Sequence, residues 1–375
     1  MLTVAPYPVF PGTHGGRVRC WGLAQALVAA GDHVDLLFPW TPGQPLRASM
    51  RDGVALHPQR FAWNVVPRLV PDRAVPSVVS QALQPYAIGP RLRLRRFDGH
   101  DAVLFELPNY ARWMGRAPRG AKVVYSAHNV EYDFWSALLP PTRRRPHLLR
   151  AIRAIEARAV AASDMLLVPT AADEQRFGEL YGPLPRVKVL NQAATHDLSA
   201  DERDRLRPAA RARLGLLAGE RAVLFVGGPS PHNEEAARFL EHEVLPELGP
   251  EYRLVLAGEC VTPANGEGGR ALRLGYVDDL RPLLAAADVA ANPVPWAAGM
   301  SLKVAEYRAA GLPVVATPAG VRGVRETNGD VHVAERTRFV QVLREVLVRP
   351  GSHAHGRAAW PDRGPELHDA LAALL

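Results

Sequence analysis

Short apolar runs alternate with longer amphipathic segments along this chain, and the alternation occurs in two separate series. The first series has runs at residues 2–5, 33–38, 102–105, 122–126, 165–168 and 188–190, and the second has runs at residues 222–226, 252–257, 289–292 and 313–317. Most of the runs are continuously apolar, which is typical of parallel strands that helices cover on both faces. The pattern therefore predicts an α/β fold with two parallel sheets.

Three segments between these runs have helical periodicity. Residues 17–30 are followed by Gly31, residues 302–310 are followed by Gly311, and residues 233–248 show the same pattern. Glycine commonly stands just beyond the end of a helix. We expect these segments to be helices that cover the sheets.

The polar, charge-rich stretch at residues 198–213 separates the two series. The predicted domains are residues 1–195 and 196–350, followed by a tail and terminal helix at residues 351–375. Whether this helix returns to the first domain stays open. Residues 41–96 are rich in Pro and Arg, and we expect them to add helices and loops to the first domain.

The composition is that of a globular protein without membrane-spanning helices. The chain has 375 residues, a length that suits two domains, and no run reaches the ~18 apolar residues that a spanning helix needs. Its start lacks the features of a secretory signal. The two cysteines, Cys20 and Cys260, lie far apart, which argues against a disulfide framework or a cysteine zinc site. We expect a cytoplasmic protein.

Positive charge is concentrated in residues 1–199, which hold 24 Lys and Arg against 15 Asp and Glu. Dense basic clusters lie at residues 91–96 and 143–145. Such an excess favours an anionic partner, for example a phosphorylated substrate or an anionic membrane surface at the inner face of the membrane. A solvated basic face is the simpler alternative. Nucleic acid is not expected, because no nucleic-acid-reading motif accompanies the charge.

Two strand-to-helix junctions carry glycine pairs, Gly15-Gly16 followed by Arg17, and Gly227-Gly228. In parallel sheets, ligands bind where strands end and the next helices begin. Glycine lets the backbone approach a ligand, and a helix N-terminus offers amides to an anion. Neither loop has the spacing of a P-loop or a dinucleotide-binding loop, so plain turns remain an alternative.

Four strand-to-helix junctions stand out in the sequence, and the one at residues 293–306 is the most specific. Ser301 or Gly299 can cap the helix and leave amides free for a phosphate. Lys303 and Glu306 are three positions apart and share one helix face. The cation would suit a phosphate and the carboxylate would suit a ribose diol, whereas a solvated Lys–Glu pair is the common alternative.

The remaining junction, residues 126–131, places His128 after a strand. The histidine would face a cleft or pack under its loop. Glu131 is the one nearby residue that could share a metal, and two ligands do not make a site. We therefore predict no metal here.

The motifs follow one another along nearly the whole chain. They are His14-Gly15-Gly16-Arg17, Gly31-Asp32-His33-Val34, His128-Asn129-Val130-Glu131, Val189-Leu190-Asn191, Phe225-Val226-Gly227 with Pro231-His232-Asn233, Gly275-Tyr276-Val277, and Gly299–Glu306 with Ala309–Val315. Their joint order resembles the retaining glycosyltransferases of family 4, also called glycosyl transferases group 1. The resemblance implies the GT-B fold, in which two Rossmann-like domains face each other across a cleft.

The resemblance also implies a role for each residue of the site. Glycines of the first loop would lie beside the diphosphate of a nucleotide sugar, His128 would face the sugar, and Glu306 would hold the ribose. The amides of residues 299–301 would receive the distal phosphate. The predicted catalytic residues are His128, Lys303 and Glu306, and the predicted binding residues are Gly15, Gly16, Arg17, Gly227, Gly228, Gly299, Met300, Ser301 and Leu302.

Two departures from the family pattern put donor choice and the diphosphate clamp in question. The family motif has two Glu eight positions apart, and the first position here is Ala298. The Arg and Lys that usually hold the diphosphate are replaced by Gly228 and by His232 or Asn233. We hypothesise that Lys303, with Arg17 or Arg19, supplies the missing charge.

The predicted function is transfer of a sugar from a nucleoside-diphosphate sugar to a hydroxyl acceptor such as a glycan, a lipid-linked sugar or a natural product. The resemblance implies a retaining, hexosyltransferase-like reaction, with the acceptor on the first domain and the nucleotide sugar on the second. The sequence has no Asp-x-Asp, and no metal cofactor is expected. The alternatives are a degenerate protein that binds a nucleotide sugar or a partner without turnover, and a GT-B sugar-nucleotide epimerase.

Overall fold

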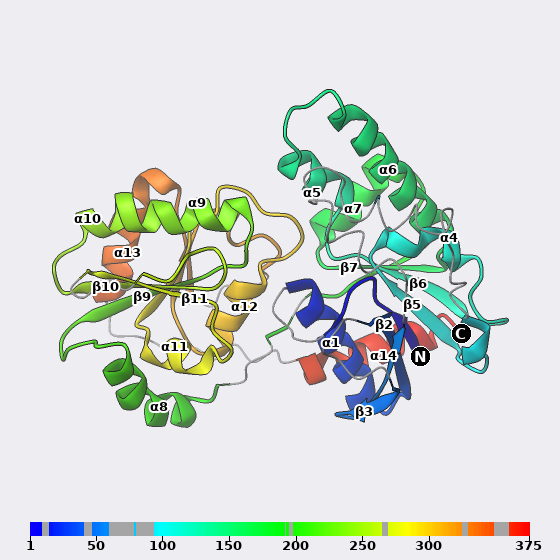
Figure 1. The fold of residues 1–375 in the computed structure, drawn as a ribbon, viewed down its shortest axis with the longest axis horizontal. Coiled ribbons are helices and arrows are strands. Elements are labelled where there is room, and N and C mark those ends of the chain that lie inside the picture. The colour runs from blue at the N-terminus through cyan, green and yellow to red at the C-terminus, as the bar shows by residue number, and fades with distance from the viewer. Residues whose placement is uncertain are drawn as a thin grey trace. The chain divides into compact units, whose positions relative to one another are not determined.

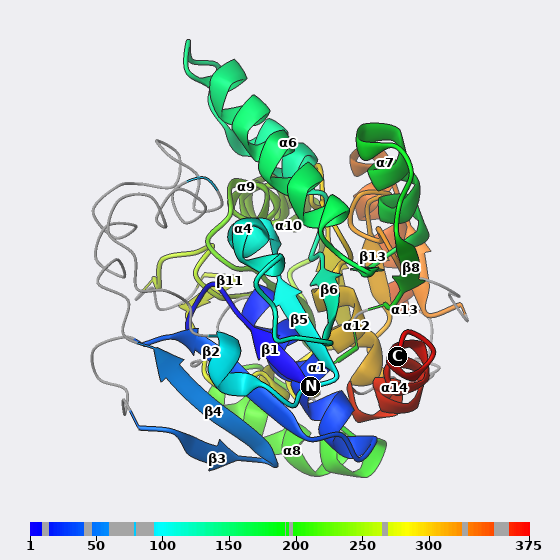
Figure 2. The same cartoon turned by 90° about the vertical axis from the view of Figure 1, so that its right-hand side faces the viewer.

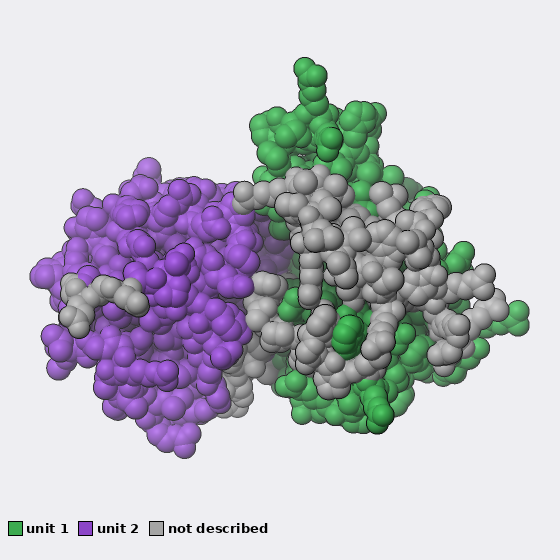
Figure 3. Space-filling model, in the orientation of Figure 1, with its two compact units in different colours: residues 1–192, 360–375 green, residues 193–359 purple. Residues whose placement is uncertain are grey.

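The computed structural model of the chain contains two α/β units, each built on its own sheet (Figure 1). It describes residues 1–9, 15–40, 47–59, 79, 94–191, 193–194, 198–264, 269–324, 329–348 and 360–375. Unit 1 comprises residues 1–192 and 360–375, and unit 2 comprises residues 193–359 (Figure 3). The predicted pair of Rossmann-like α/β domains is confirmed.

Unit 1 has an eight-stranded sheet in the order β3-β4-β2-β1-β5-β6-β7-β8. Every strand except β3, which lies at one edge, is parallel to its neighbours. The order reverses between β1 and β5, and the carboxyl ends of strands at such a switch point are where open parallel sheets bind ligands. The strands are β1 (Leu2–Val4), β2 (Val34–Pro39), β3 (Ser49–Arg51), β4 (Val54–Gln59), β5 (Ala102–Glu106), β6 (Lys122–Ser126), β7 (Met165–Val168) and β8 (Arg186–Val189).

Strands β3 and β4 correct, for residues 49–59, the expectation that residues 41–96 contain helices and loops. Within the described part of that segment, the chain turns at Asp52-Gly53, both with positive φ, and pairs as an antiparallel hairpin. Asp-Gly is a strong short-range hairpin signal. Strand β4 alternates buried and half-buried residues, so a search for continuously apolar runs passes over it.

Unit 2 has a six-stranded parallel sheet in the order β11-β10-β9-β12-β13-β14. The order again reverses near its middle, between β9 and β12, so this unit has its own switch point. The strands are β9 (Arg221–Val226), β10 (Tyr252–Ala257), β11 (Ala271–Gly275), β12 (Val289–Asn292), β13 (Val314–Ala316) and β14 (Val331–Val333).

Helices and short helical turns connect the strands of both units. Those of unit 1 are α1 (Gly15–Ala29), α4 (Ala111–Met114), α5 (Glu131–Leu138), α6 (Arg145–Ala161), α7 (Ala171–Tyr181) and α14 (Gly364–Ala372), with turns η1 (Leu94–Phe97), η2 (Pro108–Tyr110) and η5 (Trp360–Arg363). Those of unit 2 are α8 (Ala200–Arg213), α9 (Pro231–Phe239), the π-helical turn η3 (Leu240–Val244), α10 (Leu245–Glu247), α11 (Arg281–Ala286), α12 (Leu302–Ala309), η4 (Arg336–Arg338) and α13 (Phe339–Val348). No helix in the described ranges is both long enough and apolar enough to cross a bilayer.

Helix α8 occupies the charge-rich stretch at residues 198–213, which separates the two series of apolar runs. It begins at a Ser199 cap, whose hydroxyl accepts from the Glu202 amide, and it belongs to unit 2. Arg207 and Arg211 on this helix both pair with Asp288, just before β12. The charges of this stretch therefore fasten a helix to its unit.

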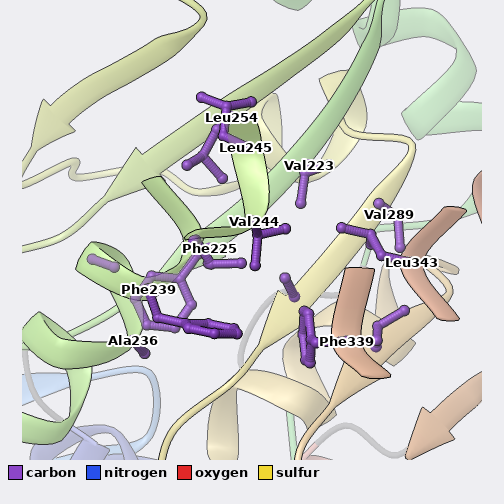
Figure 4. Packing of buried hydrophobic residues seen from close by; sticks show 14 of the residues in the cluster. Val223, Phe225, Ala236, Phe239, Val244, Leu245, Leu254, Val289, Phe339 and Leu343 are labelled. Carbon is purple, nitrogen blue, oxygen red and sulfur yellow. The ribbon is translucent and has the colours of Figure 1, made fainter. Parts of the chain in front are cut away.

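Aliphatic and phenylalanine side chains pack together in a buried cluster of unit 2 (Figure 4). Phe239 of α9 and Phe339 of α13 meet edge to face, with ring centroids 5.9 Å apart. Both pack in one buried cluster with Val223 and Phe225 of β9. This packing holds the carboxyl end of β9 and the start of α9 on a rigid base.

The C-terminal segment packs on α1 of unit 1 (Figure 2). Trp360 is almost fully buried, and a Cβ built on Gly22 would lie 2.4 Å from its ring. A Cβ on Gly364 would lie 2.3 Å from the carbonyl oxygen of Ala26. Two glycines therefore permit the close approach of this segment to the helix that carries the first glycine loop.

Candidate functional site

A buried histidine–glutamate pair lies at the switch point of unit 1. His128 follows β6, and its Nε2 lies 2.6 Å from Oε2 of Glu106, the last residue of β5. The Glu106 side chain is fully buried, and that of His128 is 9% exposed. Because the carboxylate can only accept, it holds the proton of His128 on Nε2 and fixes the ring.

The predicted residues Gly16 and His128 come together at this point. A Cβ on Gly16 would lie 3.0 Å from Nδ1 of His128 and 3.1 Å from the hydroxyl of Tyr7. Glycine is therefore the residue that fits, and Nδ1 of His128 faces the first turn of α1. Gly15, Gly16 and Arg17 all lie in that first turn, whereas His14 lies outside the described residues.

Several polar atoms around the pair are buried without a hydrogen bond. Within the described chain, the three guanidinium nitrogens of Arg19, Oε1 of Glu106 and the hydroxyl of Tyr7 have no partner. Burial lowers the pKa of the fully buried Arg19, and the nearby Glu106 and Tyr7 oppose that shift. Buried polar groups are nearly always paired, so this concentration marks a place that a polar ligand can complete.

The backbone is strained at this switch point of unit 1. Leu107, directly after Glu106, has φ 66° and ψ 163°, a combination that favours glycine. A leucine held there costs on the order of 1–3 kcal/mol. Such strain typically accompanies functional sites, where it fixes a side chain in one position.

Glu131, the fourth residue of the His-Asn-x-Glu motif, serves the packing of α5. Its carboxylate accepts a hydrogen bond of 2.9 Å from the indole of Trp135. Burial and the neighbouring Glu156 raise the pKa of Glu131 to about 8. Glu131 therefore belongs to a different hydrogen-bond network from that of His128.

The switch point of unit 2 holds a half-buried lysine. The ammonium of Lys303, on α12, donates to Oδ1 of Asn233 at 2.6 Å and lies 4.5 Å from the centre of the Phe225 ring. Burial lowers the pKa of Lys303 to about 7. No ion pair joins Lys303 to a carboxylate among the residues that the structure describes. An ammonium without a counter-ion in such a place favours an anionic ligand.

Two glycines, Gly227 and Gly228, follow β9 near this lysine. A Cβ on Gly227 would lie 2.8 Å from Sγ of Cys260 and 2.9 Å from Cβ of Asn233. A Cβ on Gly228 would meet nothing within 4 Å, so this glycine borders open space. Lys303, Asn233 and Gly227 thus form one cluster.

His232 and Trp296 lie at the same end of the sheet, with ring centroids 4.5 Å apart. Burial, and to a lesser extent Lys303, lowers the pKa of His232 to about 4. His232 is therefore neutral at physiological pH and adds no charge beside Lys303.

The N-terminus of α12 lacks a side-chain cap. Ser301 is the N-cap residue, but its hydroxyl makes no capping bond and accepts from Asn292 at 3.1 Å. Its amide donates to the carbonyl of Arg322, which corrects the expectation that this amide is open to a phosphate. The first amides of a helix have no intrahelical partner, and those of Leu302 and Lys303 therefore come closest to the predicted role.

The loop before α12 is fixed rather than loose. Gly299 has φ 64°, which favours glycine, and its carbonyl accepts from the Arg322 guanidinium at 3.0 Å. Met300 follows it directly. Glu306 lies one turn beyond Lys303 and is buried, so the simple alternative of a solvated Lys–Glu pair is wrong.

Three residues near the site are not predicted from the sequence, namely Glu106, Tyr7 and Cys260. Glu106 is an acidic residue at the end of an otherwise apolar strand, and that position is the signal that could have found it. Tyr7 and Cys260 carry no comparable signal, because only the fold brings them beside Gly16 and Gly227.

Two family descriptions match this chain, one on each unit. "Glycosyltransferase Family 4" matches residues 13–193, and "Glycosyl transferases group 1" matches residues 220–348. Together they cover most of the sequence, in the order that the motifs predict.

Curated relatives agree with this assignment, and a solved structure shares the fold. The D-inositol 3-phosphate glycosyltransferase of Thermobispora bispora is 30% identical over 206 residues, 54% of this chain and 45% of the relative. That of Rhodococcus jostii is 28% identical over 272 residues, 66% of this chain and 58% of the relative. The matched part thus spans about half the length of these relatives. HepE of Anabaena, solved in complex with UDP and glucose, superposes with a TM-score of 0.63 at 15% identity over 99% of both chains.

Proposed function

The chain belongs to the family 4 glycosyltransferases and has their GT-B fold, and from this premise we propose that it transfers a sugar from a nucleoside-diphosphate sugar to a hydroxyl acceptor. We propose further that the reaction retains the anomeric configuration and needs no metal. The observation that carries the proposal is Lys303, a half-buried lysine whose pKa is lowered, beside a glycine loop and a helix N-terminus without a side-chain cap.

Lys303 and the α12 amides would hold the diphosphate of the donor. The ammonium lies against Asn233, one of the two positions where the family usually has its clamp lysine, so charge lost from α9 is restored from α12. As the sugar leaves, negative charge develops on the diphosphate, and fixed donors stabilise it more strongly than water does. Glu306 would accept hydrogen bonds from the ribose hydroxyls.

Unit 1 would position the sugar and the acceptor. Glu106 fixes His128 with Nδ1 directed at the first turn of α1, which presents a defined acceptor atom to a sugar hydroxyl. Such positioning accounts for much of catalysis when the leaving group is already good. The relatives named for D-inositol 3-phosphate make a phosphorylated polyol a natural first acceptor to test, and the basic charge of residues 1–199 suits it.

We also propose a peripheral contact between unit 1 and an anionic membrane. Arg143 and Arg144 are exposed just before α6, whereas the cluster at residues 91–96 lies largely outside the described residues. Co-sedimentation with vesicles containing anionic lipid, against neutral vesicles, tests this contact. Equal binding to both would contradict it.

A thermal-shift screen tests the donor site. UDP, GDP, TDP and their sugars are added to the full chain with and without Mg²⁺. One nucleotide should raise the Tm by mass action, equally in both conditions, and less in Glu306→Ala. The control is Lys188→Met, since Lys188 is a surface lysine paired with Glu366 of unit 1.

Product analysis then separates the candidate functions. NMR of the product's anomeric proton distinguishes retention from inversion. Binding without turnover across phosphorylated polyols, glycans and lipid-linked acceptors would favour a non-catalytic protein, for which Ala298 in place of the first family Glu is the motivating observation. Absence of any nucleotide shift would contradict the proposal itself.

A further inference from the structure

Three histidines of unit 1 converge on one buried aspartate. Asp35 in β2 receives Nε2 of His33 at 3.0 Å and Nε2 of His100 at 2.7 Å on Oδ2, and Nε2 of His57 at 2.5 Å on Oδ1. His33 directly precedes β2, His57 lies in β4, and His100 stands in the turn before β5. Strand β4 lies beside β2, and β1 lies between β2 and β5 (Figure 2). The four residues come from three separate segments, and only the fold brings them together.

The two contacts that the His100 ring makes require an explanation. Its Nδ1 lies 2.8 Å from the carbonyl oxygen of Phe97. A carbonyl can only accept, so Nδ1 carries the proton, and Nε2 of the neutral ring carries a lone pair. That lone pair faces Oδ2 of Asp35 at 2.7 Å. Two acceptors at this distance repel each other unless a cation, either a metal ion or a second proton, lies between them.

The donor set suits a metal ion. One donor atom from each of His33, Asp35 and His100 lies within 4.8 Å of the other two. Both nitrogens contact Oδ2 of Asp35, at 3.0 and 2.7 Å, and a modest side-chain rotation that opens these contacts admits an ion at about 2.0–2.2 Å from each ligand. Imidazole nitrogens with a carboxylate favour zinc among the common cations, whereas magnesium and calcium prefer oxygen alone. Three protein ligands leave a fourth tetrahedral position for water.

The surroundings have the outer partners of a metal site. Ligating histidines usually donate their second ring proton to a carbonyl or carboxylate, which fixes the tautomer, and the Phe97 carbonyl does this for His100. His57 donates to the second oxygen of Asp35 and so orients the carboxylate. The His33 side chain is 73% exposed, which gives an ion a route from solvent.

We propose that His33, Asp35 and His100 bind one zinc ion, with His57 and the Phe97 carbonyl as outer partners. The site ties the start of β2 to the turn before β5. It departs from the expectation that the protein has no metal, but it does not touch the donor site. His33 and His100 precede their strands, whereas Glu106 ends β5 and His128 follows β6. In a parallel sheet, the two groups therefore lie at opposite ends of the strands.

The test is zinc binding to the full chain without a histidine tag, after metal removal and dialysis. Competition with a chromogenic zinc chelator at pH 7.5 should give one ion per chain, together with a higher Tm. His33→Gln and His100→Gln should each weaken zinc binding at least about tenfold, because even an outer partner is worth about 10–100-fold. His368→Gln is the matched control: His368 also pairs with an aspartate of unit 1, Asp32, at 3.0 Å, and its loss should change nothing.

Two results would overturn the proposal. The first is a failure of specific zinc binding, seen either as well below one ion per chain or as equal zinc affinity in the wild type and His33→Gln. The His33 side chain is exposed, so we expect its replacement to leave folding intact. The other is a Tm that rises on acidification to pH 6 but does not respond to zinc, which would identify the cation between His100 and Asp35 as a proton. Cobalt substitution adds an independent readout, because a tetrahedral cobalt site absorbs in the visible and the His100→Gln protein should lose that band.

Discussion

The two switch points of this molecule use the same sheet topology and opposite electrostatics. In unit 1, the carboxylate of Glu106 contacts His128 at 2.6 Å, and the guanidinium of Arg19 lies nearby without a hydrogen bond. In unit 2, the ammonium of Lys303 has only the amide oxygen of Asn233 and the face of Phe225. The first place contains a paired glutamate and histidine, whereas the ammonium of the second lacks a counter-ion among the described residues.

This difference separates positioning from charge binding. A paired site loses little when no ligand is present, so it can hold a side chain in a fixed orientation. An unpaired buried cation is costly in the free protein, and its cost is offset only when an anion arrives. We therefore expect changes in unit 2 to alter nucleotide affinity and changes in unit 1 to alter turnover.

The largest effect is expected from Lys303→Met. Nucleoside-diphosphate binding should weaken by at least about a hundredfold, because a charge-assisted contact in a buried site is lost. The free protein should at the same time become more stable, by about 2–4 kcal/mol, because burial holds the pKa of Lys303 near 7, well below that of an exposed lysine. Calorimetric titration and Tm measure the two effects. Weak binding with lower stability would instead indicate a structural lysine, and Lys188→Met should change neither.

The second effect concerns the paired site. Glu106→Gln keeps the shape but removes the charge that fixes the proton of His128 on Nε2, and His128→Ala removes the ring. Each should lower kcat roughly 10- to 100-fold while nucleotide affinity changes less than about threefold. Steady-state kinetics beside a binding titration test this split. An equal loss of affinity in both variants would erase the contrast between the units.

The third effect is a pH dependence confined to unit 2. With a pKa of about 7 in the free protein, Lys303 loses its proton as pH rises above 7, whereas a bound diphosphate holds the proton on. Affinity for the nucleotide should therefore fall by up to about tenfold per pH unit between pH 7 and 9, a range in which the phosphate is already ionised. Lys303→Arg should flatten the profile, because arginine stays charged. A flat profile in the wild type would contradict the assignment of Lys303 to the diphosphate.

The sequence predicts the architecture well because its signals are local. Continuous apolar runs place β6, β7, β10 and β12 at their observed bounds, since fully buried parallel strands need such runs. Strands β4 and β11 escape the same search, because β4 alternates between buried and half-buried residues and most of β11 is half-buried.

The site is predicted only where a residue stands next to a strand end or helix start. Gly16, His128 and Lys303 meet that condition. Glu106 and Tyr7 become part of the site through contacts across the sheet, and the histidines around Asp35 follow no spacing rule, because the residues span positions 33 to 100. Ser301 is the opposite case. Its position predicts a helix cap, but its hydroxyl accepts a hydrogen bond from Asn292 instead.

The smallest effect on nucleotide binding is expected from Gly22→Ala, which disturbs the packing of the C-terminal segment on unit 1. The added Cβ would lie 2.4 Å from the Trp360 ring, so the C-terminal segment must shift away from α1. Overpacking of this kind costs about 1–3 kcal/mol, which should appear as a lower Tm and faster proteolysis after Trp360. Gly115→Ala is the control, because a Cβ there meets nothing within 4 Å and its φ is −69°. Nucleotide affinity should stay at the wild-type value in both variants, since unit 2 keeps Lys303 and its helix intact. A marked loss of affinity in Gly22→Ala would show that the packing of the C-terminal segment on α1 acts on the donor site, and the two units could then no longer be treated as separate in their chemistry.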